Sequence, residues 1–294
     1  MKIRLGTRGS QLALVQSELF AALLRPAGHE VKLVPIVTEG DVRPIDISAG
    51  EGVFVAAIAR ALVAGEIEIA VHSAKDVPLE EDADLVIAAF PERADPRDVL
   101  VTRDGRATLE TLHAGATVGT DSPRRAGFVR AARPDLRVVP LHGNVETRLR
   151  RLDAGEVDAL VLAAAGIDRL GRSERIDQRL DPEVIAPAPG QGALAVQARR
   201  SDVELLRLLA AWDVESVRLA VETEREVLKA TGGTCRAPVG ALAAIDGASF
   251  TLLVAGVNSD GTGKRVEKIK GLGIDAKTLA ADAGRRLLAE VALR

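Results

Sequence analysis

The sequence has 294 residues, of which 47% are hydrophobic. This length predicts two or three domains with a core each and excludes a disordered tail protein. The 39 Lys and Arg residues nearly balance the 42 Asp and Glu residues, giving a formal net charge of −3. The chain therefore lacks the overall positive charge typical of nucleic-acid-binding proteins. With five Phe, one Trp and no Tyr, stacking platforms for single strands are not expected either.

The cysteine content and the N-terminal sequence predict a soluble, cytoplasmic protein. Cys235 is the single cysteine and cannot form a disulfide within the chain, which fits a reducing compartment. The opening residues, Met1–Gly6, read as a strand and lack the apolar core of a signal peptide. No apolar run approaches the roughly 18 residues needed to span a bilayer. We therefore expect neither export nor membrane association.

The first part of the chain alternates strand-like runs with helical patterns, which is typical of parallel sheets with crossover helices. The first predicted unit is a strand at Lys2–Leu5, a turn at 6–9 and a helix with one apolar face made of Leu12, Val15, Leu19 and Leu23. The second unit is predicted as a strand, a helix and a strand, at Val31–Val37, Val53–Leu62 and Ile67–Val71. The last of these strands runs into His72-Ser73-Ala74-Lys75-Asp76, and such strand ends often carry chemistry.

A charged connector at Glu92–Asp98 separates this part from a second, similar pattern. A helix is predicted to start at Pro123, capped by Asp121 or Ser122. The strands around it are predicted at Ala116–Gly119, Arg137–Leu141, Ala159–Leu162 and Ala193–Ala198. An arginine-rich helix is expected at Val145–Leu152, and the Pro/Gly stretch Ala186–Gly192 is a candidate hinge.

The domain prediction follows from a repeated strand-to-helix turn. Gly6-Thr7 and Gly119-Thr120 each follow a strand and open a helix, which indicates two similarly built α/β domains with a ligand cleft between them. We assign residues 1–93 with 193–212 to the first and residues 97–187 to the second. Residues 215–294 form a small α+β domain, with a helix to Lys229, a hairpin around 259–261 and a closing helix from Asp275.

Arginines at predicted strand ends are the main candidates for ligand binding. Helix N-termini favour anions there, and guanidinium groups bind carboxylates through two hydrogen bonds. The candidates are Arg8, Arg124, Arg125, Arg148 and Arg169. Each alone has about even odds of being a solvated surface residue, but their joint placement favours a carboxylate-rich small molecule. No Gly-x-x-x-x-Gly-Lys loop is present, so a nucleotide is not indicated.

Ser73, Lys75 and Asp76 also lie at a strand end, where a carboxylate and an ammonium group meet a substrate together. Taken alone, the pair Lys75–Asp76 favours a surface ion pair over a catalytic one, and only its location makes it a candidate. The loop position of Cys235, after a helix end, does not favour a thiolate. The four histidines show no metal-ligand spacing, so no metal site is expected.

Five motifs together give the sequence a family resemblance. They are Gly6-Thr7-Arg8-Gly9-Ser10, His72-Ser73-Ala74-Lys75-Asp76-Val77-Pro78, Asp95-Pro96-Arg97-Asp98, Gly143-Asn144-Val145 and Pro189-Gly190-Gln191-Gly192-Ala193. In order and spacing they resemble the porphobilinogen deaminases, also called hydroxymethylbilane synthases, over nearly the whole chain. The resemblance implies two domains like a type II periplasmic binding protein and a third domain that carries the cofactor cysteine.

The resemblance also implies a transferase of tetrapyrrole (haem and porphyrin) biosynthesis. Cys235 would carry a dipyrromethane cofactor, one per chain, through a thioether. Four porphobilinogen molecules would condense on this primer with loss of ammonia and be released by hydrolysis as hydroxymethylbilane. A monomer is expected, with porphobilinogen as the small-molecule partner.

Site residues are implied at the matching positions. Asp76 and Lys75 would be catalytic, because a carboxylate stabilises the cation that remains when ammonia leaves. Beside Cys235, the cofactor would contact Ser73, Lys75, Asp76, Thr120, Ser122, Arg124, Arg125, His142, Gly143 and Arg148. The substrate would contact Arg8, Ser10, Gln16, Arg169, Gln191 and Gly192.

The chain departs from the family pattern at several positions, and two other functions stay open. His142 stands where an arginine is usual, Thr234 where a glycine is usual, and Glu51 near a common lysine position; Asp121-Ser122-Pro123 replaces Ser-Ser-Leu. The first alternative function is a binding protein that holds a carboxylate ligand without converting it. The second is an inactive homologue in which His142 and Thr234 prevent cofactor assembly.

Overall fold

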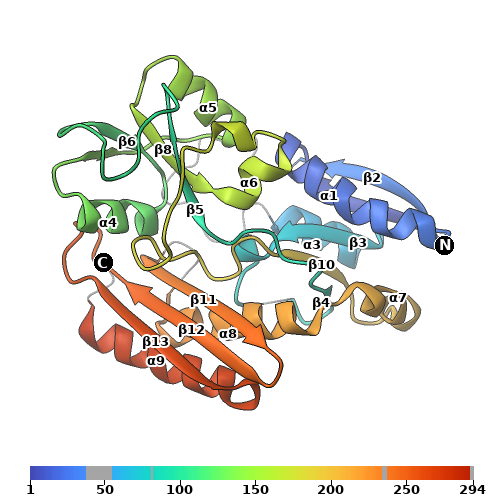
Figure 1. The fold of residues 1–294 in the computed structure, drawn as a ribbon. Helices are drawn as coiled ribbons and strands as arrows, with labels where there is room; N and C mark the ends of the chain where they lie inside the picture. Colours follow the sequence, from blue (N-terminus) through green and yellow to red (C-terminus); the bar gives the residue numbers. More distant parts are fainter. Residues whose placement is uncertain (38–54, 81, 234–236, 292–294) are drawn as a thin grey trace. The chain divides into compact units, whose positions relative to one another are not determined.

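The computed structural model describes residues 1–37, 55–80, 82–233 and 237–291. Its internal contacts divide the chain into two compact units, and Figure 1 labels helices and strands of both. The first unit is Met1–Arg93 with Ala193–Arg218, and the second is Ala94–Gly192 with Leu219–Arg294. The chain thus passes from one unit to the other after Arg93, after Gly192 and after Arg218.

The first unit contains a five-stranded sheet with the order β2-β1-β3-β10-β4. The strands are β1 (Lys2–Arg8), β2 (Glu30–Ile36), β3 (Ile69–Ser73), β4 (Leu85–Ala89) and β10 (Leu194–Arg199). β1 pairs in parallel with β2 and β3, whereas β10 runs antiparallel to β3 and β4. The strand that returns from the second crossover thus completes the sheet of the first unit.

Helices cover both faces of this sheet, and successive side chains of a strand pack against opposite faces. Ile69 and Val71 of β3 pack in one cluster with α1 (Gln11–Leu24) and α7 (Val203–Leu209). Ala70, between them, packs in another cluster with α3 (Ala56–Val63). Both faces are therefore buried, as expected for a parallel-type sheet with crossover helices.

The predicted apolar face of the first helix is wrong. Leu19 and Leu23 are 48% and 44% exposed, whereas Phe20, Ala21 and Leu24 are buried. The buried face also contains polar residues, Gln16 and Ser17, so the spacing of the leucines alone pointed to the wrong side. Contact with the sheet, and not leucine periodicity, selects the face.

The second unit contains another five-stranded sheet, with the order β7-β6-β8-β5-β9. The strands are β5 (Asp98–Thr102), β6 (Thr117–Gly119), β7 (Arg137–Val139), β8 (Ala159–Ala163) and β9 (Gln178–Arg179). β6 pairs in parallel with β7 and β8, and β5 runs antiparallel to β8 and β9. This is the layout of the first sheet, and it confirms the prediction of two similarly built α/β halves.

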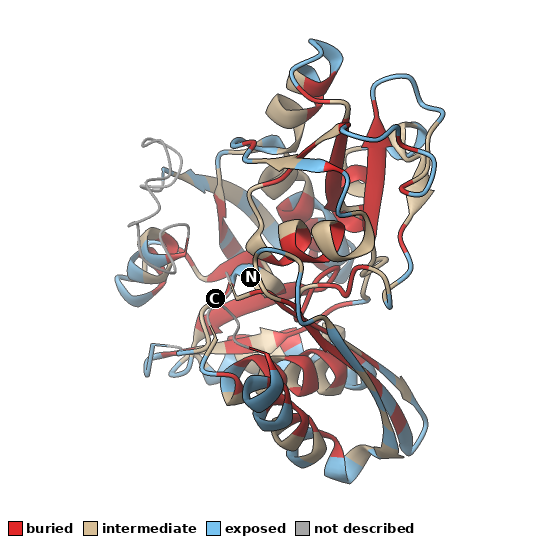
Figure 2. Ribbon diagram, turned by 90° about the vertical axis from the view of Figure 1, so that its left-hand side faces the viewer, coloured by how far each residue is buried: buried red, intermediate tan, exposed pale blue. Residues whose placement is uncertain are grey.

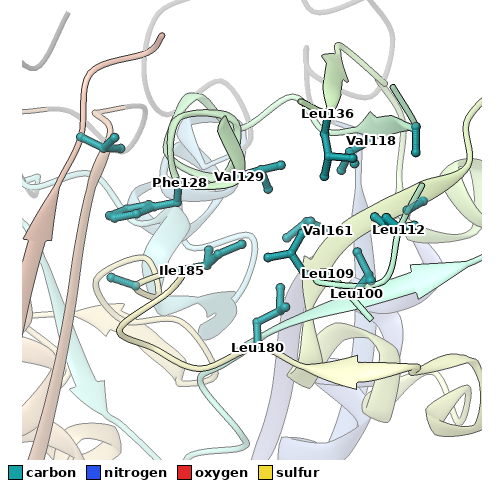
Figure 3. Packing of buried hydrophobic residues seen from close by; sticks show 14 of the residues in the cluster. Leu100, Leu109, Leu112, Val118, Phe128, Val129, Leu136, Val161, Leu180 and Ile185 are labelled. Atoms are coloured by element: carbon teal, nitrogen blue, oxygen red, sulfur yellow. The ribbon is translucent and has the colours of Figure 1, made fainter. Parts of the chain in front are cut away.

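The helices of this sheet are α4 (Pro123–Ala132), α5 (Val145–Asp153) and α6 (Ala164–Arg169). Leu100 of β5 lies in one core cluster with Phe128 of α4 (Figure 3). Val99 and Val101 lie in the other, with Leu149 of α5. The inner strands β5 and β10 are buried along nearly their whole length. Figure 2 shows, in red, strands that are buried along much of their length.

The C-terminal segment adds an antiparallel sheet, β11-β12-β13, to the second unit. Its elements are α8 (Glu215–Ala230), β11 (Val239–Asp246), β12 (Ser249–Gly256), β13 (Arg265–Leu272) and α9 (Ala276–Glu290). α9 contacts β12 and β13, and the predicted hairpin around 259–261 connects these two strands. Ala255 and Val257 also join the core beside α4.

The predicted fold class, α/β halves with a smaller α+β part, is confirmed. The contacts place the predicted second domain and most of the third in one compact unit. The proposed boundary between these two domains stays a prediction. No described helix combines the length and the apolar character that crossing a bilayer requires.

Candidate active site

In the first unit, the predicted site residues gather at the carboxyl ends of two neighbouring parallel strands. β1 ends at Arg8 and β3 ends at Ser73, and the two strands pair with Leu5 opposite Ile69. The carboxyl ends of parallel strands meet at the same edge of a sheet, where α/β proteins bind ligands. The fold therefore brings Arg8 to the same edge as the segment 73–76.

Asp76 lies on a short turn that is fixed by backbone hydrogen bonds at its start and at its end. The residues Ala74–Asp76 form a single 3-10 turn. Ala74 N donates to Ala193 O over 3.0 Å, and Val77 N donates to Ala74 O over 3.3 Å. Within this turn Ala74 is buried, Lys75 is half-buried and Asp76 is exposed. A carboxylate on a fixed turn at a sheet edge is suited to stabilise a cationic ligand.

Two predicted substrate contacts of the first unit already make bonds within the protein. Ser10 is the N-cap of α1, and its Oγ accepts a hydrogen bond from Ala13 N over 3.3 Å. Gln16, only 5% exposed, donates from Nε2 to Ser73 Oγ over 3.0 Å. These side chains order the helix and the strand end around the turn.

His72 precedes this segment and is buried, with 6% exposure. Burial lowers its pKa to about 4 from the ordinary 6.5, and the neighbouring Gln197 side chain opposes this effect only in part. At neutral pH the imidazole is therefore uncharged and does not act as a cation beside Asp76.

In the second unit, the equivalent strand end leads into α4. Thr120, 4% exposed, accepts a hydrogen bond from Ser122 N on its Oγ1 over 3.2 Å. Ser122 is the N-cap, as predicted, and its Oγ accepts from Arg125 N over 3.4 Å. Pro123 occupies the first helical turn, so both hydroxyl groups serve to start the helix.

Arg124 and Arg125, on the first turn of α4, bind a buried carboxylate that was not among the predicted site residues. Asp98 is 0% exposed, and the two arginines are 4% and 6% exposed. Arg124 Nη1 donates to Asp98 Oδ2 over 2.7 Å. Arg125 donates from Nε and Nη2 to Asp98 Oδ1, over 3.0 and 2.8 Å. Arg124 Nη1 also donates to Ala186 O.

Arg148 and His142 lie near the start of α5. Arg148 Nε donates to Gly143 O over 2.7 Å. The pKa of Arg148 is lowered by burial and further by the positive charge of Arg125, while Asp121 opposes the shift. His142 is exposed, and its Nδ1 lies 2.8 Å from Asp121 Oδ2. Guanidinium groups are thus crowded here, which favours a bound carboxylate.

The backbone conformation at position 143 requires a glycine. Its φ is +123°, and a Cβ would lie 2.9 Å from Thr147 Cγ2. Asn144 caps α5 by accepting from Thr147 N over 2.8 Å. The motif Gly143-Asn144-Val145 therefore has a local structural reason, apart from any ligand contact.

Arg169, expected at a helix start, is the last residue of α6. This corrects the prediction that all the candidate arginines share helix N-termini. Its Nη2 donates to Gly192 O over 2.7 Å, and burial lowers its pKa to about 10. It remains a cation at neutral pH.

Gln191 and Gly192 lie where the chain leaves the second unit. Gln191 is 0% exposed and donates from Nε2 to Pro96 O and to Asp98 Oδ1, over 2.7 and 3.0 Å. A Cβ on Gly192 would lie 2.5 Å from Ala94 O, so the close approach of the two crossing segments requires glycine there.

The donor set fits a ligand with several carboxylates. Arg124 and Arg125 carry two positive charges against the one negative charge of Asp98, and Arg148 adds another nearby. Since guanidinium groups at a helix N-terminus attract anions, these side chains suit a small molecule that carries more than one carboxylate group. Among the described residues, no group of three or more His, Cys, Asp and Glu is placed to hold a metal ion.

Cys235, Thr234 and Glu51 lie outside the described residues. Two buried carboxylates were missed by the sequence reasoning. One is Asp98; the other is Glu224 of α8, which is 0% exposed and accepts from Gly190 N over 2.7 Å and from Ala243 N over 2.8 Å. Two signals for Asp98 were present in the sequence: it stands at the head of an apolar run, Val99–Val101, and it is the last residue of the motif Asp95-Pro96-Arg97-Asp98.

Comparison with known families covers nearly the whole chain. Residues 3–207 match the family model described as porphobilinogen deaminase, dipyromethane cofactor binding domain. Residues 218–292 match the model for the porphobilinogen deaminase C-terminal domain.

Curated relatives agree with these models. The chain is 47% identical to a porphobilinogen deaminase from Acidothermus cellulolyticus, over 98% of this chain and 88% of the relative. It is 46% identical to one from Roseiflexus sp., over 97% of this chain and 98% of the relative. A porphobilinogen deaminase from Cutibacterium acnes is 49% identical over 82% of this chain and 76% of the relative.

The solved structures that the chain matches include a periplasmic substrate-binding protein of an ABC transporter from Coxiella burnetii. It is 16% identical with a TM-score of 0.44, over 76% of this chain and 96% of that one. An ancestral arginine-binding protein is 18% identical with a TM-score of 0.39, over 71% of this chain and 89% of that one.

Proposed function

The chain belongs to the porphobilinogen deaminase family, and from this membership we propose how its own residues divide the work of the reaction. The enzyme is a transferase of tetrapyrrole biosynthesis. It joins four porphobilinogen molecules into the linear tetrapyrrole hydroxymethylbilane and releases ammonia at each addition. The dipyrromethane cofactor, when bound, supplies the pyrrole to which the first substrate is added.

Asp76 is the proposed catalytic carboxylate. When ammonia leaves the aminomethyl group of porphobilinogen, the pyrrole becomes a cation. The exposed carboxylate of Asp76, on the fixed turn after β3, would stabilise this positive charge and accept the pyrrole N–H. A fixed negative group aimed at developing positive charge lowers the barrier without reorganisation of solvent. Lys75, half-buried in the same turn, is its proposed partner in proton transfer.

The arginines are the proposed carboxylate receptors. Arg125 and Arg148, close together at the starts of α4 and α5, are proposed to hold carboxylates of the cofactor. Arg8, at the end of β1, and Arg169, at the end of α6, are proposed to hold substrate carboxylates. Burial of Arg169 supports this role because a guanidinium with less water around it binds an anion more strongly.

His142 is the proposed replacement for the arginine usual at its position. Its ring nitrogen is paired with Asp121, so it is held near the start of α4. The attachment of the cofactor to Cys235 through a thioether is likewise proposed, on the family resemblance.

The remaining predicted contacts are supported less directly. Each of them makes a hydrogen bond to another group of the protein. They are Gln16, Ser73, Ser10, Thr120, Ser122, Arg124, Gln191 and Gly192. These bonds support a role in shaping the site, and direct contact of these residues with cofactor or substrate stays a prediction. A cytoplasmic location and a monomeric state also stay predictions.

Family membership favours the enzyme over a binding protein without turnover or an inactive homologue. The observation that carries the proposed roles is the exposed carboxylate of Asp76 on its fixed turn. The test is Asp76→Asn, with Glu80→Gln at another exposed carboxylate as the matched control. We expect Asp76→Asn to keep the covalent cofactor, seen by intact-mass spectrometry, and to lose most of its turnover of porphobilinogen. Turnover equal to that of Glu80→Gln would remove Asp76 from the catalytic role.

A further inference from the structure

We propose that Asp98 is a positioning residue that orients the carboxylate-binding arginines of α4. This inference rests on the proposed function, because it assigns Asp98 the task of holding Arg125 in place for the cofactor. Asp98 would act only through the arginines, since it is 0% exposed.

The geometry fixes one edge of the Arg125 guanidinium. Arg125 Nε and Nη2 both donate to Asp98 Oδ1, and the Arg124 guanidinium donates to Oδ2. Gln191 adds a bond from Nε2 to Oδ1 over 3.0 Å, and its Oε1 lies 3.4 Å from Arg125 Nη2. Among the hydrogen bonds of the described residues, none involves Arg125 Nη1. The bonded edge faces Asp98, and one donor nitrogen is left for a ligand.

Strand alternation explains why Asp98 faces α4. It lies two residues before Leu100 on β5, and alternate residues of a strand point to the same face. Leu100 packs in the core cluster that contains Phe128 and Val129 of α4. Asp98 therefore points toward the same helix as Leu100, and it meets that helix at its first turn, where Arg124 and Arg125 lie.

The electrostatics explain why a carboxylate is needed there. Cationic side chains on the first turn of a helix are opposed by the positive end of the helix dipole. Arg124 and Arg125 both occupy that turn and are nearly buried. One buried carboxylate between them offsets part of this cost, and it is itself stable in the interior because both of its oxygens are bonded.

Two roles of Asp98, as a balancing negative charge or as a positioning residue, predict opposite effects of its removal on carboxylate binding. If Asp98 acted only as a negative charge, its removal would make the arginine cluster more positive, and carboxylates would bind more tightly. If Asp98 positions Arg125, its removal leaves that side chain free to turn, and carboxylates bind more weakly. The sign of the change decides between the two.

The experiment compares wild type, Asp98→Asn, Arg124→Met and the double variant Arg124→Met/Asp98→Asn. Each apoprotein is incubated with porphobilinogen, and the covalent mass increment is followed by intact-mass spectrometry. Folding is checked by thermal unfolding, and the KM and kcat for porphobilinogen are measured on the loaded proteins. We expect Asp98→Asn to slow cofactor uptake and raise KM about tenfold, which corresponds to roughly 1.4 kcal/mol, with a smaller change in kcat.

If Asp98→Asn alone does not fold, the double variant Arg124→Met/Asp98→Asn is compared with Arg124→Met instead. In the Arg124→Met background Asp98 faces a single arginine. Its further change to Asn replaces the charged acceptor of Arg125 and Gln191 with a neutral amide, which holds the guanidinium less firmly. We expect the double variant to take up cofactor more slowly and to have a higher KM than Arg124→Met. An equal or lower KM with equal uptake would overturn the inference. Failure of the wild type itself to convert porphobilinogen would instead overturn the proposed function.

Discussion

Gln16 on α1 donates a hydrogen bond from its Nε2 to the Oγ of Ser73, the last residue of β3, over 3.0 Å. Both atoms lie in a partly buried setting, and Gln16 itself is 5% exposed. The bond joins the first helix to the strand end from which the Asp76 turn begins. The orientation of the turn therefore depends on a side chain 57 residues away in the sequence.

Gln16→Ala tests this dependence. The change leaves Ser73 Oγ without its partner, which we expect to lower the free energy of unfolding by about 1–2 kcal/mol and to reduce kcat several-fold. Urea denaturation and steady-state assays measure the two effects. Gln11→Ala, at an exposed position of the same helix, is the matched control. Indistinguishable results for the two variants would show that the bond does not support the turn.

Cys235→Ala tests the attachment of the cofactor. We expect the denatured variant to have the mass of the bare polypeptide, whereas wild type carries an excess equal to two porphobilinogens less two ammonias. The reason is that Cys235 is the only thiol in the chain, and a thioether requires one. Thermal unfolding checks that the variant folds. A covalent pyrrole adduct on the alanine variant would refute the assignment.

Arg169→Met tests the proposed substrate receptor at the end of α6. Because burial leaves this guanidinium poorly hydrated, its loss is expected to raise KM for porphobilinogen about tenfold, or roughly 1.4 kcal/mol. Arg172→Met, at an exposed position nearby, is expected to leave KM unchanged.

The charge state of Arg169 gives this prediction a pH dependence. Its pKa is about 10, so the cation is present below that pH and is lost above it. The KM of the wild type should therefore stay level to about pH 9 and then rise, while that of Arg169→Met should lack this rise. A rise of equal size in both proteins would assign the alkaline change to another group.

His72 predicts a loss of stability in weak acid. The unfolded chain takes up a proton near pH 6.5, whereas the folded chain does so only near pH 4. Stability is therefore complete above about pH 6.5 and falls as pH drops toward 4, by about 3 kcal/mol in total. His72→Gln should lose less stability than wild type between pH 7 and pH 5 in urea denaturation. His113→Gln, at an exposed histidine, should follow wild type, and identical pH profiles for all three proteins would contradict the prediction.

Most of the helices and strands, and the class of fold, could be predicted from the amino-acid sequence. The cap Ser122 with Pro123, the helix from Val145 and the hairpin after β12 all form where their local signals place them. Local chemistry suffices for these features because capping, turn and propensity effects act within a few residues. The motifs also identified the family, because their order along the chain does not depend on folding.

Which side chains face one another could not be predicted from the sequence and depends on the tertiary structure. It selected the buried face of α1, placed Arg169 at a helix end, and brought Asp98 beneath Arg124 and Arg125. Asp98 is 26 residues from Arg124 and 93 from Gln191 along the chain. No local pattern encodes such a contact, because it depends on strand order and on the alternation of side chains across the sheet.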